Sequence, residues 1–187
     1  MNFAFDLLMA CVFFRFIGVR VGGIDVLPDC LGVLLAILAI VLLRRREEDF
    51  RFALTPAALL FFVSLAGLYN FMPDEQNLVY AALYILSELA YLALELWLYR
   101  RLFAASAQMY RAGVTRAQTR AVWIYGAVRA VGIVCNLAVW WGSSSVEAAA
   151  FTPAMVVFWV YYVLYFFVAA LLIYQLYLQK PKFHDEA

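Results

Sequence analysis

The chain has 187 residues, of which 67% are hydrophobic and 14% are charged, and its formal net charge is +1. A soluble domain is closer to half apolar and a quarter charged, so this chain cannot cover its apolar surface with its own polar residues. The composition excludes an ordinary soluble domain. It predicts a single integral membrane domain, residues 1–187, whose main partner is the lipid bilayer.

A helix needs about 20 residues to cross a bilayer, and six apolar segments approach that length. They are 2–19, 26–43, 56–71, 79–99, 117–141 and 153–177. The predicted fold class is therefore all-α, a polytopic transmembrane helical bundle. The first segment is the weakest because it contains Asp6 and Arg15. Its first residues, MNFAFD, lack the basic residues of a signal peptide, so we expect a retained span.

Basic residues gather in alternate connections between these segments and so predict an orientation. One side holds Arg44, Arg45, Arg46, Arg51, Arg100, Arg101, Arg111, Arg116, Arg120, Lys180 and Lys182. The other side holds only Arg20. Cytoplasmic loops carry the excess of Lys and Arg, so both termini are predicted to lie in the cytoplasm.

Helix-start signals lie at three of the predicted boundaries. Thr55-Pro56 and Thr152-Pro153 each place a capping hydroxyl before a proline at the first helical position. The run Thr115-Arg116-Ala117-Gln118 fits a capping box. The arginine-rich connection 100–120 has two interpretations, which are a continuation of the fourth helix along the membrane surface and a solvated basic loop.

The stretch GGIDVLPDCLG, residues 22–32, places two aspartates beside an apolar run. A helix beginning after Asp29 would be too short to span, so we expect it to begin at Val26 with Asp25 as its N-cap. Asp29 then lies one turn below the outer surface, at the depth of Arg15, and an Arg15–Asp29 contact is predicted. Arg15, Asp25 and Asp29 form an outer cluster that either pins the first hairpin, which we favour, or marks an outward-facing mouth.

The same stretch resembles a group of proteins. Leu27, Pro28, Asp29, Gly32 and Leu34 match a PD-x-x-G pattern followed by an aliphatic helix. This pattern is similar to that of small multi-pass membrane proteins of bacteria that have no assigned activity. The resemblance covers the first quarter of the chain. It implies a bacterial origin and the cytoplasmic (inner) membrane, and it brings no catalytic residues.

The segments 79–99 and 117–141 carry polar stripes at helical spacing. The stripe on 79–99 comprises Tyr84, Glu88, Tyr91, Glu95 and Tyr99, and the stripe on 117–141 comprises Tyr125, Arg129, Gly132, Asn136 and Trp140. A charge inside a membrane costs several kcal/mol or more unless it is paired. We therefore expect Glu88 and Arg129, near mid-membrane, to face each other or to face water, and not lipid, with Glu95 nearer the inner surface. The candidate cluster is Glu88, Glu95, Arg129, Asn136, Tyr84 and Tyr91.

Two functions follow from this cluster. The one we favour is a structural or partner-binding membrane component, because a buried ion pair can fix how helices pack. Its partner would be another membrane protein or a second copy of the chain. The alternative is a small transporter with a proton- or solute-handling cavity lined by Glu88, Glu95 and Arg129. Trp159, Tyr161, Tyr162 and Tyr165 are candidate cavity walls.

Enzyme readings have little support. The only histidine, His184, lies in the polar tail, and the sequence has no P-loop and no GxGxxG motif. Cys11, Cys30 and Cys135 lie in or beside apolar runs and read as small apolar side chains. We expect no catalysis, no metal, no cofactor and no nucleic-acid partner.

Overall fold

A computed structural model describes residues 2–16, 20–21, 24–25, 29–66, 78–109, 114–143 and 153–179. These residues form α1 (Asn2–Phe16), α2 (Asp29–Arg44), α3 (Arg51–Ala66), α4 (Leu78–Met109), α5 (Arg116–Ser143) and α6 (Pro153–Tyr177). A 3-10 turn, η1 (Glu48–Phe50), precedes α3, and β1 (Arg20–Val21) pairs antiparallel with β2 (Ile24–Asp25). The all-α prediction is confirmed.

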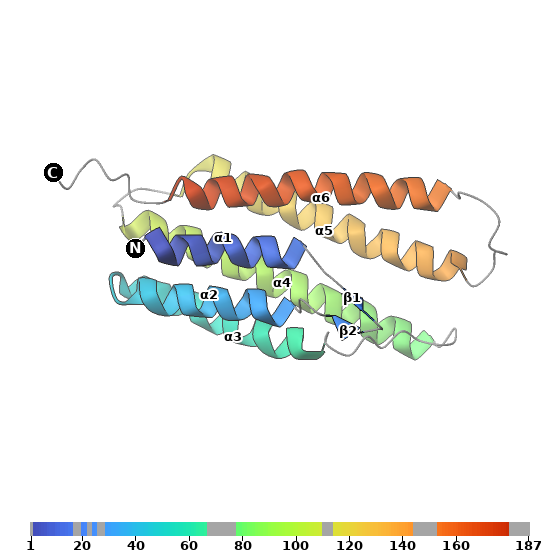
Figure 1. The fold of residues 1–187 in the computed structure, drawn as a ribbon, viewed down its shortest axis with the longest axis horizontal. Helices are drawn as coiled ribbons and strands as arrows, with labels where there is room; N and C mark the ends of the chain where they lie inside the picture. The colour runs from blue at the N-terminus through green and yellow to red at the C-terminus, as the bar shows by residue number, and fades with distance from the viewer. Residues whose placement is uncertain are drawn as a thin grey trace.

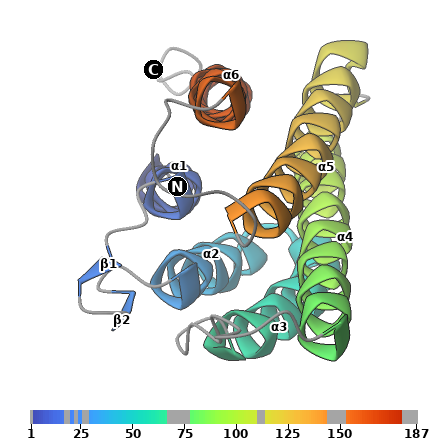
Figure 2. The same cartoon turned by 90° about the vertical axis from the view of Figure 1, so that its right-hand side faces the viewer.

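The helices follow one another around a closed ring. Each described helix packs against its neighbours in the chain, and α6 returns to contact α1. Figure 2, which views the bundle end-on, shows this order around the molecule. In Figure 1 the first turn of α1, the last turn of α6 and the turn between α2 and α3 lie at the same end of the bundle. We call this the basic end, because Arg44 and Arg51 flank that turn.

Small residues let α2 approach its neighbours closely. Gly32, Ala36 and Ala39 follow one another at spacings of three or four, and all are buried. Their side chains occupy little space, so neighbouring backbones can come near. These small residues therefore form one buried face of α2.

The predicted start of the second helix falls at the edge of the described residues. We expected it to start at Val26 with Asp25 as its cap; residues 26–28 lie outside the described part of the chain, and the described helix α2 begins at Asp29. Asp25 lies in strand β2, where it pairs with Arg20 of β1. Asp29 is then the acid at the positive end of the helix dipole.

The third helix begins earlier than predicted, and the assignment of Pro56 to its first position is wrong. α3 starts at Arg51, so Pro56 lies inside the helix. Phe50, Ala53, Ala57 and Leu60 have the spacing of one helical face and are almost fully buried. Burial of this face extends the helix back to the η1 turn. The cost is the one hydrogen bond that a proline nitrogen cannot donate.

The fourth helix runs through the arginine-rich connection. α4 ends at Met109, ten residues past the predicted end at Tyr99, and α5 begins at Arg116. The continuation of the fourth helix is therefore confirmed. The predicted capping box also forms, since Thr115 N donates to Gln118 Oε1 at 2.9 Å and Gln118 N donates to Thr115 Oγ1 at 3.2 Å. α6 has the predicted bounds.

Large apolar side chains cover the outside of the described helices. Examples from five helices are Phe3, Leu38, Phe62, Leu86 and Phe167, each at least half exposed. Within the described residues, one segment, Trp159–Tyr177, is both long and apolar enough to cross a membrane, and less than half of it is buried. The helices α2 and α3, at 16 residues each, reach roughly 24 Å.

Candidate functional site

Arg129 of α5 lies between two carboxylates of α4. Glu88 and Glu95 are seven residues apart, which places them on one face about two turns from each other. Arg129 Nη2 lies 3.6 Å from Glu88 Oε2, and Arg129 Nε lies 3.8 Å from Glu95 Oε2. The predicted facing of Glu88 and Arg129 is confirmed, and the second carboxylate joins the same cation.

The two carboxylates have different surroundings. The side chain of Glu95 is 3% exposed, whereas that of Glu88 is 31% exposed. Glu95 Oε1 also accepts a hydrogen bond of 2.9 Å from the Tyr125 hydroxyl. Tyr125 lies four residues before Arg129, so one face of α5 supplies both a cation and a hydroxyl to Glu95. Glu95 is therefore the inner member of the cluster.

Tyrosine rings enclose the charged groups. Arg129 Cζ lies 5.6 Å from the centroid of the Tyr165 ring on α6, close enough for a cation–π contact. Tyr161 stacks on Tyr165 with centroids 5.9 Å apart. On the α4 side, the Tyr99 ring meets the Tyr125 ring edge-on at 5.5 Å. The cluster thus joins three helices, α4, α5 and α6.

Gly132 allows Tyr161 to reach the cluster. A Cβ atom built at Gly132 would overlap the Cζ and hydroxyl of Tyr161, so this ring lies directly against the α5 backbone. From that position the Tyr161 ring stacks on Tyr165, whose ring faces Arg129. A residue with any side chain at position 132 would displace the tyrosine, which explains the glycine in the polar stripe of α5.

A small central cavity lies on the other side of Glu95. Its lining comes from four helices and comprises Cys11, Asp29, Gly32, Val33, Leu60, Tyr91, Glu95, Leu98 and Tyr99. Its volume of about 10 Å³ is close to what a single water molecule needs. Asp29 and Glu95 thus border the same cavity, although the sequence placed them in separate clusters at different depths.

The length of α4 sets the position of Glu95 along the helix. α4 continues past the predicted end at Tyr99 to Met109, so Glu95 lies near the middle of α4, and its place nearer the inner surface than Glu88 stays a prediction. The run Arg100-Arg101 had been interpreted as the end of the span. Glu95 and Asp29, the first residue of α2, line the same cavity. The predicted Arg15–Asp29 contact involves a side chain outside the described residues.

The remaining predicted residues divide into three groups. Tyr91 lines the central cavity, whereas Tyr161 and Tyr165, which we expected as walls of a transport cavity, are buried beside the cluster and line neither this cavity nor the hollow between α4 and α5. Trp159 and Tyr162 are instead exposed, and so they face away from the cluster. The side chains of Tyr84, Asn136, Arg15 and Asp25 lie outside the described part of the chain.

The sequence analysis missed two contacts. The Tyr125–Glu95 hydrogen bond was detectable, because Tyr125 and Arg129 share a face at a spacing of four. The shared cavity of Asp29 and Glu95 was not detectable, because it depends on where α2 starts and how far α4 extends. Across the described residues, no three His, Cys, Asp or Glu side chains come together as metal ligands would.

Comparisons with protein-family models, with curated proteins and with solved structures found no match for this chain.

Proposed function

We propose that the protein is a polytopic component of a bacterial cytoplasmic membrane, with six spans and both termini in the cytoplasm. In this proposal the cluster of Glu88, Glu95 and Arg129 is structural, and it holds α4, α5 and α6 in register. The protein acts as a scaffold whose apolar outer face is available to another membrane protein or a second copy of the chain. The bacterial setting rests on the resemblance of the PD-x-x-G stretch.

The distribution of polar and apolar side chains carries this proposal. Glu95, at 2% exposure, is among the most buried residues, whereas Trp159 is 63% exposed. Water would favour the reverse, because burying apolar area stabilises a fold and burying an ionised carboxylate costs free energy. A hydrocarbon solvent favours what is observed, since charged groups in a membrane face the bundle interior and pair with one another.

The helix lengths and ends agree with this topology. α1 begins and α6 ends at the basic end of the bundle (Figure 1). An even number of spans puts both termini on the same side, and the positive-inside rule makes the basic side the cytoplasmic one. The 16 residues of α2 and α3 fall short of a hydrocarbon core of about 30 Å, and local bilayer thinning accommodates a mismatch of a few ångströms. α4, with 32 residues, is longer than the core and projects beyond it.

The closed packing around the cluster favours a scaffold over a transporter. The central cavity that borders Glu95 has room for about one water molecule. The larger hollow on the molecule, between α4 and α5, is lined by neither Glu88, Glu95 nor Arg129. Ion pairs in an enclosed site that joins three helices can specify a packing arrangement.

A second candidate function, proton handling, has one observation in its favour. Asp29 and Glu95 border the same water-sized cavity. Glu95 also lies 3.8 Å from Arg129, which in turn lies 3.6 Å from Glu88. Carboxylates separated by a water molecule can pass a proton, and membrane proton relays are built from such chains. The experiment below separates this candidate from the scaffold.

The test is a double-mutant cycle on Glu95→Gln, Arg129→Gln and the double variant, measured by thermal unfolding in detergent. Arg129→Gln leaves both carboxylates without their cation, and removing one partner of a buried ion pair costs about 3–5 kcal/mol in soluble proteins. Glu95→Gln removes the more buried of the two carboxylates at Arg129 and replaces the charged acceptor of the Tyr125 hydroxyl. We expect both single variants to melt well below the wild type. We expect the double variant to recover much of the loss, because the carboxylate that remains is Glu88, which at 31% side-chain exposure is much less buried than Glu95.

The opposite result would overturn the scaffold. If all three variants melt like the wild type, the charges are not held for stability. Proton flux into liposomes that contain the wild-type protein or Glu95→Gln then tests the second candidate. A flux that the substitution abolishes would assign the cluster to proton transfer.

A further inference from the structure

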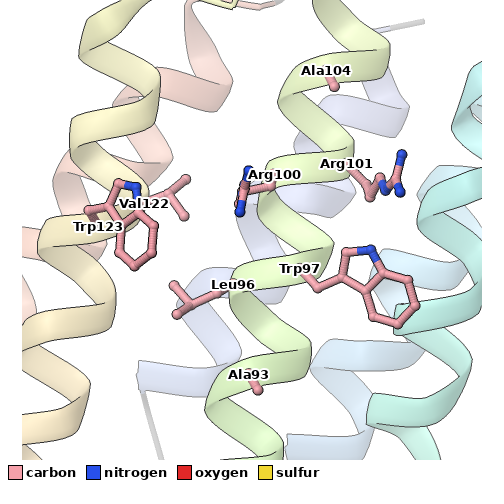
Figure 3. A pocket seen from close by; sticks show the side chains of 8 residues that line it. All are labelled: Ala93, Leu96, Trp97, Arg100, Arg101, Ala104, Val122 and Trp123. Atoms are coloured by element: carbon pink, nitrogen blue, oxygen red, sulfur yellow. The ribbon is translucent and has the colours of Figure 1, made fainter.

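A hollow lies on the outer side of the bundle, and none of the charged cluster residues lines it. It has a volume of about 620 Å³ and lies between α4 and α5. Figure 3 shows its lining, which comprises Ala93, Leu96, Trp97, Arg100, Arg101, Ala104, Val122 and Trp123. The lining includes two arginines and no acidic residue. We call this hollow the α4–α5 groove.

The groove exists because α4 presents small residues beside large ones. Ala93 and Ala104 leave open space, and Trp97 and Trp123 border that space while staying 40% and 59% exposed. Close to the groove the two helices touch, since a Cβ atom at Gly126 would lie 2.9 Å from Leu96 Cδ2. The groove is therefore an opening beside a close helix crossing, and it has apolar walls.

The two arginines point in different directions from α4. Arg100 extends toward α5, whereas Arg101 extends toward α3 (Figure 3). There the Arg101 guanidinium lies 5.8 Å from the centroid of Phe52, a ring that also faces Arg51 at 4.7 Å. Arg101 is thus engaged with an aromatic ring, and Arg100 is the exposed cation at the side of α5.

The groove changes from charged to apolar along α4. Arg101 lies beside Phe52, the second residue of α3, so this part of α4 is level with the start of α3 at the basic end. Ala93 lies seven residues before Arg100, about 10 Å deeper along the helix. In the proposed topology the arginines therefore lie at the level of the inner-leaflet headgroups, and Leu96 and Trp97 lie toward the acyl chains.

We propose that the α4–α5 groove binds one anionic phospholipid of the cytoplasmic leaflet. Arg100 pairs with the lipid phosphate, and an acyl chain lies along Leu96 and Ala93 between Trp97 and Trp123. The occupant follows from charge and shape together, because basic pockets between helices on the cytoplasmic side suit anionic headgroups and the apolar walls suit a hydrocarbon chain. This inference rests on the proposed membrane topology.

The experiment measures lipid binding by native mass spectrometry on the full chain in detergent. The probes are phosphatidylglycerol, which is anionic, and phosphatidylcholine, which is zwitterionic. Arg100→Gln removes the cation, and Ala104→Leu fills the groove without changing charge. Arg45→Gln is the matched control, because Arg45 is another exposed arginine at the basic end and does not line the groove.

We expect phosphatidylglycerol to bind the wild type about tenfold more tightly than phosphatidylcholine. Arg100→Gln should weaken the binding of phosphatidylglycerol about fivefold, as expected for the loss of one basic residue at a lipid headgroup. Ala104→Leu should weaken the binding of both lipids, and Arg45→Gln should leave the binding of both unchanged. Soluble glycerol phosphate should fail to compete, because it lacks the acyl chain.

Three results would overturn the inference. They are equal losses in Arg100→Gln and Arg45→Gln, unchanged binding in Ala104→Leu, and equal binding of the two lipids. Carbonate extraction of membranes that contain the same variants separates this failure from failure of the proposed function. A chain that resists extraction but binds lipid in none of the expected ways refutes the groove alone, and a chain that is extracted refutes the membrane topology as well.

Discussion

At the scale of single residues, the contact of Gly132 with Tyr161 is the tightest fit in the charged cluster. The Tyr161 ring occupies the space that a side chain at position 132 would need. It also stacks on Tyr165, which faces Arg129. A side chain added at Gly132 would therefore displace the Tyr161 ring. Because Tyr161 stacks on Tyr165, this displacement would also disturb the contact of Tyr165 with Arg129.

We predict that Gly132→Ala lowers the free energy of unfolding by about 1–3 kcal/mol, the usual cost of overpacking a core. The added methyl group meets a rigid ring and not a flexible chain. Gly126→Ala is the matched control, because its new methyl group meets the end of the Leu96 side chain at 2.9 Å, which can rotate away. Thermal unfolding of both variants in detergent measures the difference, and equal losses would contradict the fit described for Tyr161.

At the scale of helices, the start of α5 is fixed by a reciprocal pair of hydrogen bonds. Thr115 and Gln118 each accept from the other's backbone N–H, so two donors at the helix start are satisfied. Gln118 is also buried, at 4% exposure. The box therefore fixes where α5 begins and, through α5, where Arg129 lies relative to α4.

We predict that Thr115→Ala costs about 1 kcal/mol of stability, the typical value of an N-cap side chain. Thr119→Ala is the control, because the Thr119 hydroxyl makes only an exposed bond of 3.3 Å to the Thr115 carbonyl. Thermal unfolding should separate the two variants by several degrees. A loss in Thr119→Ala as large as that in Thr115→Ala would show that the box does not determine the helix start.

The sequence predicted which segments are helical better than it predicted where each helix begins and ends. Hydropathy located the helices, and the Thr115 box and the Pro153 start were readable because each is a local signal. The start of α3 was mispredicted, because the burial of Phe50 is a tertiary effect. Pairing of Glu88 with Arg129 was predictable from the cost of isolated charges, whereas the meeting of Asp29 and Glu95 depended on the length of α4.

At the scale of the whole molecule, the ring brings the first and last helices together at the basic end (Figure 1). In the proposed topology this end lies in the cytoplasm, and the opposite end, near Asp25, lies outside. Labelling of single cysteines can test this placement directly.

We predict that an impermeant maleimide added to intact cells labels Asp25→Cys but not Arg45→Cys or Arg116→Cys. The background has Cys11, Cys30 and Cys135 replaced by alanine. After the membrane is permeabilised, the two arginine positions should also react, because both are exposed. Labelling of all three positions in intact cells would contradict the spanning topology, and the reverse pattern would invert it.

The position of Arg129 on α5, after both of its carboxylate partners on α4, has a consequence for synthesis at the ribosome. Glu88 and Glu95 of α4 are synthesised before Arg129, so they have no partner until α5 has left the ribosome. Neither helix carries a neutral cluster on its own, so in the proposed topology the two should leave the insertion channel for lipid together. The tyrosines of α6 would then seal the pair, and the last helix to be synthesised would complete the charged centre of the bundle.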